Sequence, residues 1–283
     1  MSRPSRLRVW LGLAADDLNR QKTVKFGDAN AVGSGRIYSL LVVVVLLALW
    51  ALSSGWVDPI FWPPIGGTWD RLVQLATQGF RNEPLWAHVA ISVYRVLSGV
   101  FYGALVGIPL GFAMGLSSVA RGLFDPIVEF MRPIPPLALI PLAILWFGID
   151  ETAKIVLLLL AALFIMTIAA RSGAASVNLS KVHAAYSLGA SRGQVLRHVI
   201  LPNALPEIFT GLRTAMGVCW GTVVAAELVA ADRGLGSMIM IAKNFLQTDT
   251  VVIGIVIIGL IGYAIELLMR WLERRLVPWR GKG

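Results

Sequence analysis

Few residues of this 283-residue chain have the types and spacing that covalent catalysis requires. The sequence contains no G-x-x-x-x-G-K-[ST] nucleotide loop, no G-x-S-x-G motif and no H-E-x-x-H motif. Its three histidines, His88, His183 and His198, lie in different segments, and its single cysteine, Cys219, lies in an apolar run. We therefore expect no internal disulfide, no metal site and no nucleotide site, and we expect that the protein is not an enzyme.

Glu227 is the one acidic residue well inside an apolar run. A charge near the centre of a bilayer costs about 3 kcal/mol, so its carboxylate should face protein or water. Two interpretations remain open: Glu227 gates or lines a path, or it is the structural partner of a basic residue on another helix. The basic candidates are Arg95, Arg132 and Arg213.

A polar stretch, HAAYSLGASRGQVLRHVILP from His183 to Pro202, lies between long apolar runs. Gly189 suits the left-handed conformation that ends a helix. Ser191 can cap the next helix, and Gln194 completes a capping box. Pro202 is expected to end that second helix. The stretch thus predicts a rigid helix–corner–helix unit, called the knuckle below.

The knuckle resembles the EAA loop of permease subunits in bacterial ATP-binding-cassette (ABC) importers. Ala184 and Ala185 match the two alanines, Gly189 follows after three residues, and the residues 199–202 (VILP) follow after nine more. His183 stands where the family has Glu, which puts in doubt any ion pair of that Glu with the ATPase. The alternative is an ordinary amphipathic connector.

Four further segments resemble the permeases for taurine, aliphatic sulfonates and nitrate, with the taurine permeases the most similar. They are RPIPPLALIPLAILWFGI (132–149), SLGAS (187–191), LPEIFTGLR (205–213) and VAAELVAADRGLG (224–236). The resemblance implies a type I importer with two permease copies, two cytoplasmic ATPases that hold ATP and magnesium, and a periplasmic substrate-binding protein. It implies taurine or a related small sulfonate as substrate, with nitrate, another alkanesulfonate or a pyrimidine as alternatives.

In such importers the EAA loop supplies the coupling helix that contacts the ATPase. Carried over to this sequence, the coupling residues are His183, Ala184, Ala185, Leu188, Gly189, Ala190, Ser191, Leu201 and Pro202. Two interpretations from other classes remain, an ion-coupled secondary transporter and a membrane scaffold. A secondary transporter typically has several intramembrane carboxylates or inverted repeats, whereas here one such acid is evident.

The elements that must position these residues follow from composition. The chain is 57% hydrophobic and 14% charged, too apolar for a soluble globule, which indicates an all-α polytopic membrane protein. We expect six spans: Ile37–Trp56, Ile91–Leu116, Phe124–Ile149, Ile155–Ala170, Thr214–Ala231 and Val251–Met269. We further expect a domain at 37–283 that carries the coupling loop at 183–202, preceded by a tail at 1–36.

Two of these spans carry unusual patterns. In the second span, glycines recur every four residues, which predicts a seam where a neighbouring backbone comes close; they lie at positions 99, 103, 107, 111 and 115. In the third span, prolines at 133, 135, 136 and 141 predict a kinked entry helix and a short span. Broken backbone at membrane depth is tolerated beside protein or a water-filled path, so Pro136 and Pro141 are candidate path residues together with Glu227.

The distribution of basic residues predicts the orientation. Seventeen Lys/Arg fall on the side that holds both termini and the knuckle, and five fall on the other side. Because Lys/Arg excess marks the cytoplasm, we expect both termini and the knuckle to be cytoplasmic. The resemblance to bacterial importer permeases implies that the membrane is the bacterial inner membrane. This topology accounts for the net charge of +9, so contact with membrane lipid is expected and contact with nucleic acid is not.

Overall fold

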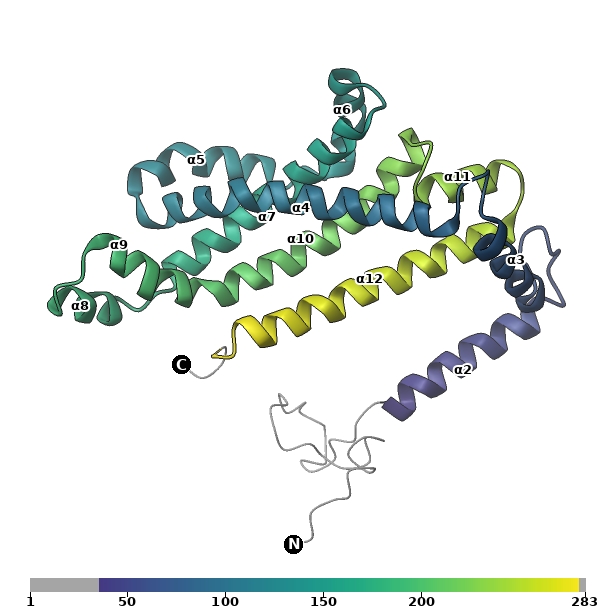
Figure 1. Ribbon diagram of the computed structural model, residues 1–283, viewed down its shortest axis with the longest axis horizontal. Coiled ribbons are helices and arrows are strands. Elements are labelled where there is room, and N and C mark those ends of the chain that lie inside the picture. Colours follow the sequence, from purple (N-terminus) through teal and green to yellow (C-terminus); the bar gives the residue numbers. More distant parts are fainter. Residues whose placement is uncertain (1–35, 280–283) are drawn as a thin grey trace, which may run out of the picture. The chain divides into compact units, whose positions relative to one another are not determined.

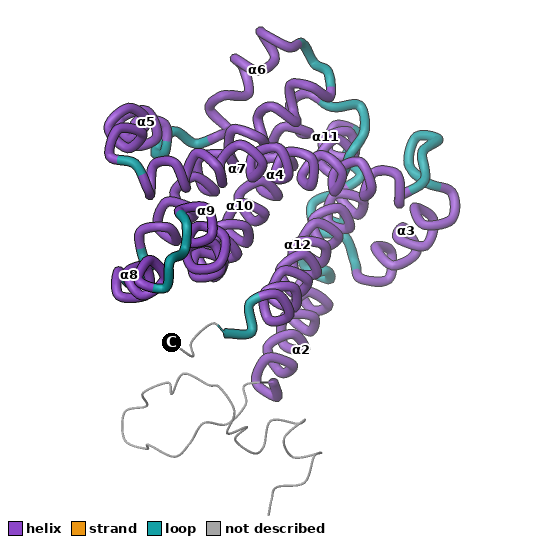
Figure 2. The backbone as a smooth tube through the Cα atoms, turned by 60° about the vertical axis from the view of Figure 1, so that its left-hand side comes forward, coloured by secondary structure: helices purple, strands orange, loops and turns teal. Residues whose placement is uncertain are grey.

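The computed structural model describes residues 36–279, with side chains from residue 40 onward, and no β-strand occurs within these ranges (Figures 1 and 2). The helices are α2 (Arg36–Ser53), α3 (Ile65–Gln78), α4 (Leu85–Leu116), α5 (Ser118–Met131), the 3-10 helix η1 (Pro136–Leu139), α6 (Ile140–Phe147), α7 (Glu151–Ala175), α8 (Leu179–Ser187), α9 (Arg192–Val195), the π-helix η2 (Leu196–Ile200), α10 (Leu201–Ala230), α11 (Leu235–Asn244) and α12 (Thr248–Leu276). The all-α prediction is confirmed. The expected tail at 1–36 lies outside the described residues, apart from Arg36.

The described residues fall into two compact units that meet between Trp69 and Asp70, namely 36–69 and 70–279. In the first unit, α2 corresponds to the expected first span, and its described apolar part is Leu40–Ser53. The segment after α2 folds back on the end of that helix, because the Trp50 indole nitrogen donates a 3.0 Å hydrogen bond to the carbonyl oxygen of Pro63.

Four helices in the second unit are long and apolar enough to cross a membrane. They are Leu85–Leu116, Glu151–Ala175, Arg192–Ala230 and Thr248–Leu276. The pair Ser118–Met131 and Pro136–Phe147 is bent by 88° and makes a fifth span if it counts as one. The chain is therefore a multi-pass membrane protein. The kink expected in the third span is confirmed, and it falls where Pro135 and Pro136 begin η1.

Pro202 does not end a helix, so this prediction is wrong. Residues 192–230 run as one helix, with Pro202 in the first turn of α10. The π-helix η2 explains why the proline is tolerated. The Leu201 amide donates to the carbonyl oxygen of Leu196, five residues earlier, so the wider turn accommodates the ring and the missing N–H of Pro202.

The glycine seam is confirmed, and it joins α4 to α7. A Cβ added at Gly103 would lie 2.5 Å from the Cβ of Ala162 and 2.9 Å from the carbonyl oxygen of Leu159. A Cβ at Gly107 would lie 2.6 Å from the carbonyl oxygen of Leu163, and the other three glycines of the series also face α7. The two backbones therefore touch directly, a packing mode typical of membrane helices.

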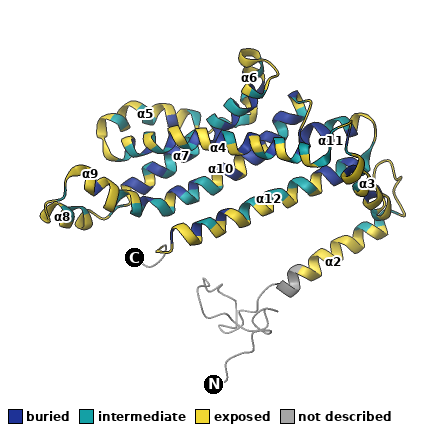
Figure 3. Ribbon diagram, viewed as in Figure 1, coloured by how far each residue is buried: buried dark blue, intermediate teal, exposed yellow. Residues whose placement is uncertain are grey.

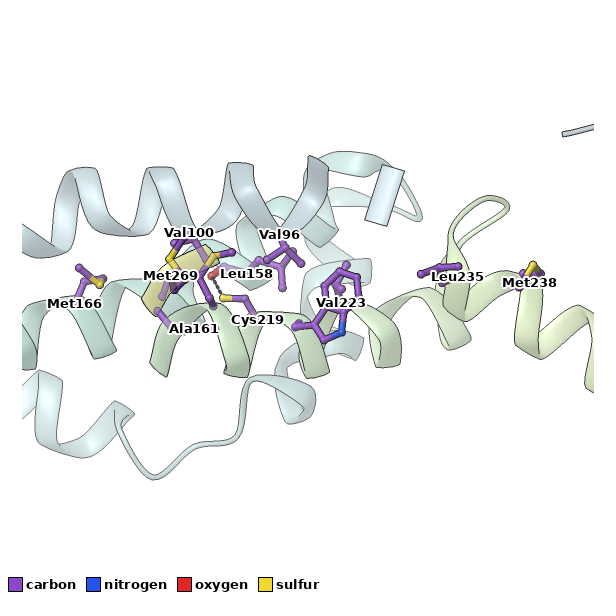
Figure 4. Packing of buried hydrophobic residues seen from close by; sticks show 14 of the residues in the cluster. Val96, Val100, Leu158, Ala161, Met166, Cys219, Val223, Leu235, Met238 and Met269 are labelled. Carbon is purple, nitrogen blue, oxygen red and sulfur yellow. Dashed lines mark hydrogen bonds between the residues drawn. The ribbon is translucent and has the colours of Figure 1, made fainter. Parts of the chain in front are cut away.

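The core continues from this seam onto α10. Figure 4 shows Val96 and Val100 of α4, Leu158 of α7 and Cys219 of α10 in one cluster. The Cys219 thiol lies 3.4 Å from the carbonyl oxygen of Leu158. Figure 3 shows that many of the buried residues lie on α4, α7 and α10, whereas α5, α6 and α8 are largely exposed.

The seam predicts a position-specific effect of added side-chain volume. Gly103→Val should destabilise the protein by about 1–3 kcal/mol, since its methyl groups must push α4 away from α7. Gly259→Val in α12 is the matched control, because nothing lies within 4 Å of a Cβ added there. The difference is measured by heating the two variants in detergent and using size-exclusion chromatography to determine the temperature at which each unfolds. Equal unfolding temperatures would contradict the seam.

Candidate functional site

The knuckle is built from α8, α9 and the corner between them. Asn178 caps α8, its side-chain oxygen accepting from the Ser180 amide at 2.9 Å. The chain then turns at Gly189, whose φ of +81° is the left-handed conformation expected there. The capping box is also confirmed: the Ser191 amide donates to Gln194 Oε1 at 2.8 Å, and the Gln194 amide donates to Ser191 Oγ at 3.4 Å.

The candidate coupling residues lie together on this exposed unit. His183, Ala184, Leu188, Gly189 and Ser191 are exposed, and Leu188 is 89% exposed. Ala185, Ala190 and Pro202 are half-buried, and Leu201 is 39% exposed. Figure 1 places α8 and α9 at one end of the α4–α7–α10 bundle and α11 at the opposite end.

The inner side of the knuckle is fixed to the bundle. Val195 of α9 is buried, and the Lys181 ammonium donates to Asn203 Oδ1 at 3.2 Å. The Trp279 indole nitrogen donates to the carbonyl oxygen of Pro202 at 3.2 Å, which joins the segment after α12 to the base of the knuckle. The unit is thus held to the bundle on its inner side and exposed on its outer side.

A buried charge network lies at the opposite end of α10. Arg95 is 1% exposed and contacts two carboxylates: its Nη1 lies 2.6 Å from Glu227 Oε1, and its Nε and Nη2 lie 2.7 and 2.5 Å from the two oxygens of Glu151. Lys154 donates to Glu151 at 3.1 Å. The two cations balance the two anions, which lowers the cost of burying them.

Glu227 is fully buried, and polar groups surround its carboxylate. The Ser92 hydroxyl lies 2.7 Å from Glu227 Oε1 and accepts from the Leu235 amide at 3.0 Å. The Gly236 amide donates to Glu227 Oε2 at 2.9 Å. A Cβ added at Gly234, whose φ is +124°, would lie 2.5 Å from Glu227 Oε1. The loop before α11 therefore closes directly over the carboxylate.

This geometry bears on the two interpretations of Glu227. Among the three basic candidates, Arg95 is the observed partner. Arg213 instead pairs with Glu266 at 2.5 Å and Glu273 at 3.3 Å, which joins α10 to α12. The observed contacts of Glu227 are structural, since they hold α4, α10 and the loop before α11 together.

A separate cavity of about 490 Å³ lies between the end of α5, η1, α7 and α10. Of the three candidate path residues, Pro136 lines this cavity, whereas Pro141 and Glu227 do not. Its charged lining residues are Arg132 and Glu207. From the sequence, Arg132 is a candidate only as a partner of Glu227, and Glu207 is not singled out, although a carboxylate directly after Pro206 in an apolar run is a usable signal.

Three residues of the network, Ser92, Glu151 and Lys154, are not singled out by the sequence alone. Ser92 and Arg95 lie three residues apart, hence on one face of α4, and this spacing was the available signal. Glu151 and Lys154 lie in the first turn of α7, and no feature of the sequence indicates that they belong to the network. Within residues 36–279, no group of three His, Cys, Asp or Glu side chains could hold a metal ion.

Comparison with solved structures identifies the class of fold. An inward-facing structure of the MetNI methionine ABC transporter matches with a TM-score of 0.58 at 21% identity, over 68% of this chain and 97% of that one. An amino acid ABC transporter solved with histidines matches with a TM-score of 0.52 at 19% identity, over 75% of this chain and 96% of that one. The fold is that of an ABC importer permease.

The chain belongs to the family of binding-protein-dependent transport system inner membrane components, whose model matches residues 103–278. It is 49% identical to the taurine transport system permease protein TauC of Escherichia coli over 86% of this chain and 90% of that protein. It is 39% identical to the putative aliphatic sulfonates transport permease protein SsuC of the same organism, over 86% of this chain and 92% of that protein. The nitrate import permease protein NrtB of Leptolyngbya laminosa is 29% identical over 86% of this chain and 88% of its own length.

The charge network predicts a large penalty for removing its cation. Arg95→Met should destabilise the protein by about 3–5 kcal/mol, because Glu227 would remain buried without a positive partner. Adding Glu227→Gln should restore part of this loss, since the unpaired charge is then gone. Arg233→Met is the matched control. Its guanidinium is 65% exposed and pairs with Glu83 at the surface, so about 0–1 kcal/mol is expected. Thermal unfolding in detergent measures all three, and a similar loss for Arg95→Met and Arg233→Met would contradict the network.

Proposed function

We propose that this permease forms the translocation path for taurine or a related small sulfonate, and that its knuckle couples the path to a separate cytoplasmic ATPase. The observation that supports taurine as the substrate is the 49% identity to a taurine permease over 90% of that protein. The coupling assignment is supported by an exposed, capped knuckle at the residues that match the EAA loop.

The proposed assembly contains two copies of this chain, two ATPases that bind ATP and magnesium, and a periplasmic substrate-binding protein. Both termini and the knuckle face the cytoplasm, which rests on the 17 to 5 division of basic residues. In this assembly the ATPases hydrolyse the nucleotide, and this chain binds the ATPases and forms the path for the substrate.

The proposed mechanism uses the helix 192–230 as a lever. At 1.5 Å per residue its 39 residues extend about 58 Å, from the knuckle to the Arg95 network. Closure of the ATPases would move the knuckle as a rigid body, because Gly189, the Ser191 cap and Val195 fix its shape. The long helix would carry that displacement to the loop that covers Glu227, so that access switches from outside to inside.

The same geometry would serve an importer for nitrate, another alkanesulfonate or a pyrimidine, so the substrate requires a direct test. Uptake of radiolabelled taurine into cells should require this chain, its ATPase and its binding protein together. Omitting each component in turn is the control. ATP hydrolysis by the assembled system that responds to nitrate or a pyrimidine and ignores sulfonates would overturn the substrate and leave the family unchanged.

The corner of the knuckle gives a prediction for coupling. Gly189→Val should weaken ATPase docking, because a β-branched residue at φ +81° is strained by about 1–2 kcal/mol or more and would redirect α9. Gly193→Val is the matched control in the same unit, since Gly193 is helical and nothing lies within 4 Å of an added Cβ. ATPase co-purification and substrate-stimulated hydrolysis, at matched membrane expression, measure the effect. Normal coupling in Gly189→Val would overturn the assignment of the knuckle as the ATPase-coupling element.

A further inference from the structure

The cavity between α5, η1, α7 and α10 combines apolar walls with two opposite charges. Its walls include Leu160, Phe164 and Ile168 of α7 and Val218 of α10. Arg132, directly after α5, supplies a guanidinium, and Glu207 of α10 supplies a carboxylate. A volume of about 490 Å³ lies within the range of roughly 300–1,000 Å³ that is typical of small-molecule sites.

Neither charge has a partner in the part of the chain that the structure describes. The side chains of Arg132 and Glu207 form no hydrogen bond and no ion pair with those residues, and they do not pair with each other. The buried charged residues behave differently, since Arg95, Lys154, Glu227 and Glu273 all form ion pairs. Among the described residues, the cavity thus presents an unpaired cation and an unpaired anion beside apolar walls.

We propose that this cavity is a transit site for a small zwitterion that carries a sulfonate and an ammonium group, with the sulfonate on Arg132 and the ammonium on Glu207. The inference rests on the proposed function and assigns its substrate contacts to named residues. It also goes beyond that function, because it makes the permease itself selective for the amino group.

The chemistry of the two ends supports this assignment. A guanidinium presents a planar fork of N–H donors that matches an oxyanion, and an ammonium presents three donors that a carboxylate can accept. The apolar walls strengthen both interactions relative to bulk water. An anion without an amino group would satisfy Arg132 and would meet the negative charge of Glu207 without a compensating cation. The site would therefore bind nitrate and simple alkanesulfonates more weakly than the zwitterion, by repulsion as well as by a missing contact.

The exposure of the two side chains suits transit. Arg132 and Glu207 are both exposed rather than buried, so water remains available to replace the substrate when it leaves. A path must bind its cargo strongly enough to admit it and weakly enough to release it. Two exposed charges that are not paired with each other meet this requirement better than a fully buried pair.

The test measures binding to the permease–ATPase complex in lipid nanodiscs without the binding protein, so that selectivity of the latter plays no part. The probes are radiolabelled taurine and radiolabelled ethanesulfonate, which lacks the amino group. Glu207→Gln should weaken taurine binding about tenfold or more, the value of one charge-assisted hydrogen bond, and should leave ethanesulfonate binding equal or tighter. Arg132→Gln should weaken both, and Arg132→Lys should retain more binding than Arg132→Gln.

Two variants remove the same charges elsewhere on the surface. Glu129→Gln and Arg274→Gln affect exposed residues outside the cavity, and both should bind the two probes as the wild type does. Wild-type taurine binding in Glu207→Gln and Arg132→Gln, or no taurine binding by the wild-type complex, would overturn the transit site. If such a complex still imports taurine with its binding protein, the proposed function stands and only this inference fails; absence of taurine uptake by the wild type would overturn both.

Discussion

Helices in a bilayer gain little from burying apolar side chains against each other, because the surrounding lipid is equally apolar. The association of α4 with α7 therefore depends on direct backbone contact, which five glycines at a four-residue spacing permit. Gly103 and Gly107 place α4 against the main chain of α7, and α10 packs on the resulting pair through Cys219 and Val223. The cavity, the charge network and the base of the knuckle are all built on helices that pack around this α4–α7 contact.

The α4–α7 contact also makes the charge network possible. Arg95 on α4 reaches Glu151 at the start of α7 because the two helices lie so close, and the same guanidinium reaches Glu227 on α10. Burying such a network is tolerated since each charge is matched and the remaining carboxylate oxygen accepts from the Gly236 amide. One end of α10 is thereby tied to the bundle by charge, and its other end carries a knuckle fixed by caps. A displacement at either end must move the other or bend the helix.

Two sets of charges in the second unit contrast with each other. Arg95 and Glu227 are buried and mutually satisfied, which suits a clamp between elements. Arg132 and Glu207 share a cavity, are exposed to it and lack partners among the described residues. An unpaired charge beside an apolar wall keeps its attraction available for a ligand, whereas a paired one has already used it.

The sequence by itself determined the features that depend on local chemistry: the all-α membrane class, the glycine seam, the capped knuckle at Ser191 and the kink near Pro136. These follow from spacing within one helix or one turn, so no distant residue was needed. It erred at Pro202, because a π-helix can absorb a proline that would end an α-helix, and composition does not show which turn will form. Only the tertiary structure decided that Glu227 pairs with Arg95 rather than Arg132 or Arg213, and that Arg132 and Glu207 share a cavity. Each of these two juxtapositions, one an ion pair and the other a shared cavity, involves residues 75 or more positions apart in the chain, and helix packing, which no local pattern specifies, brings them together.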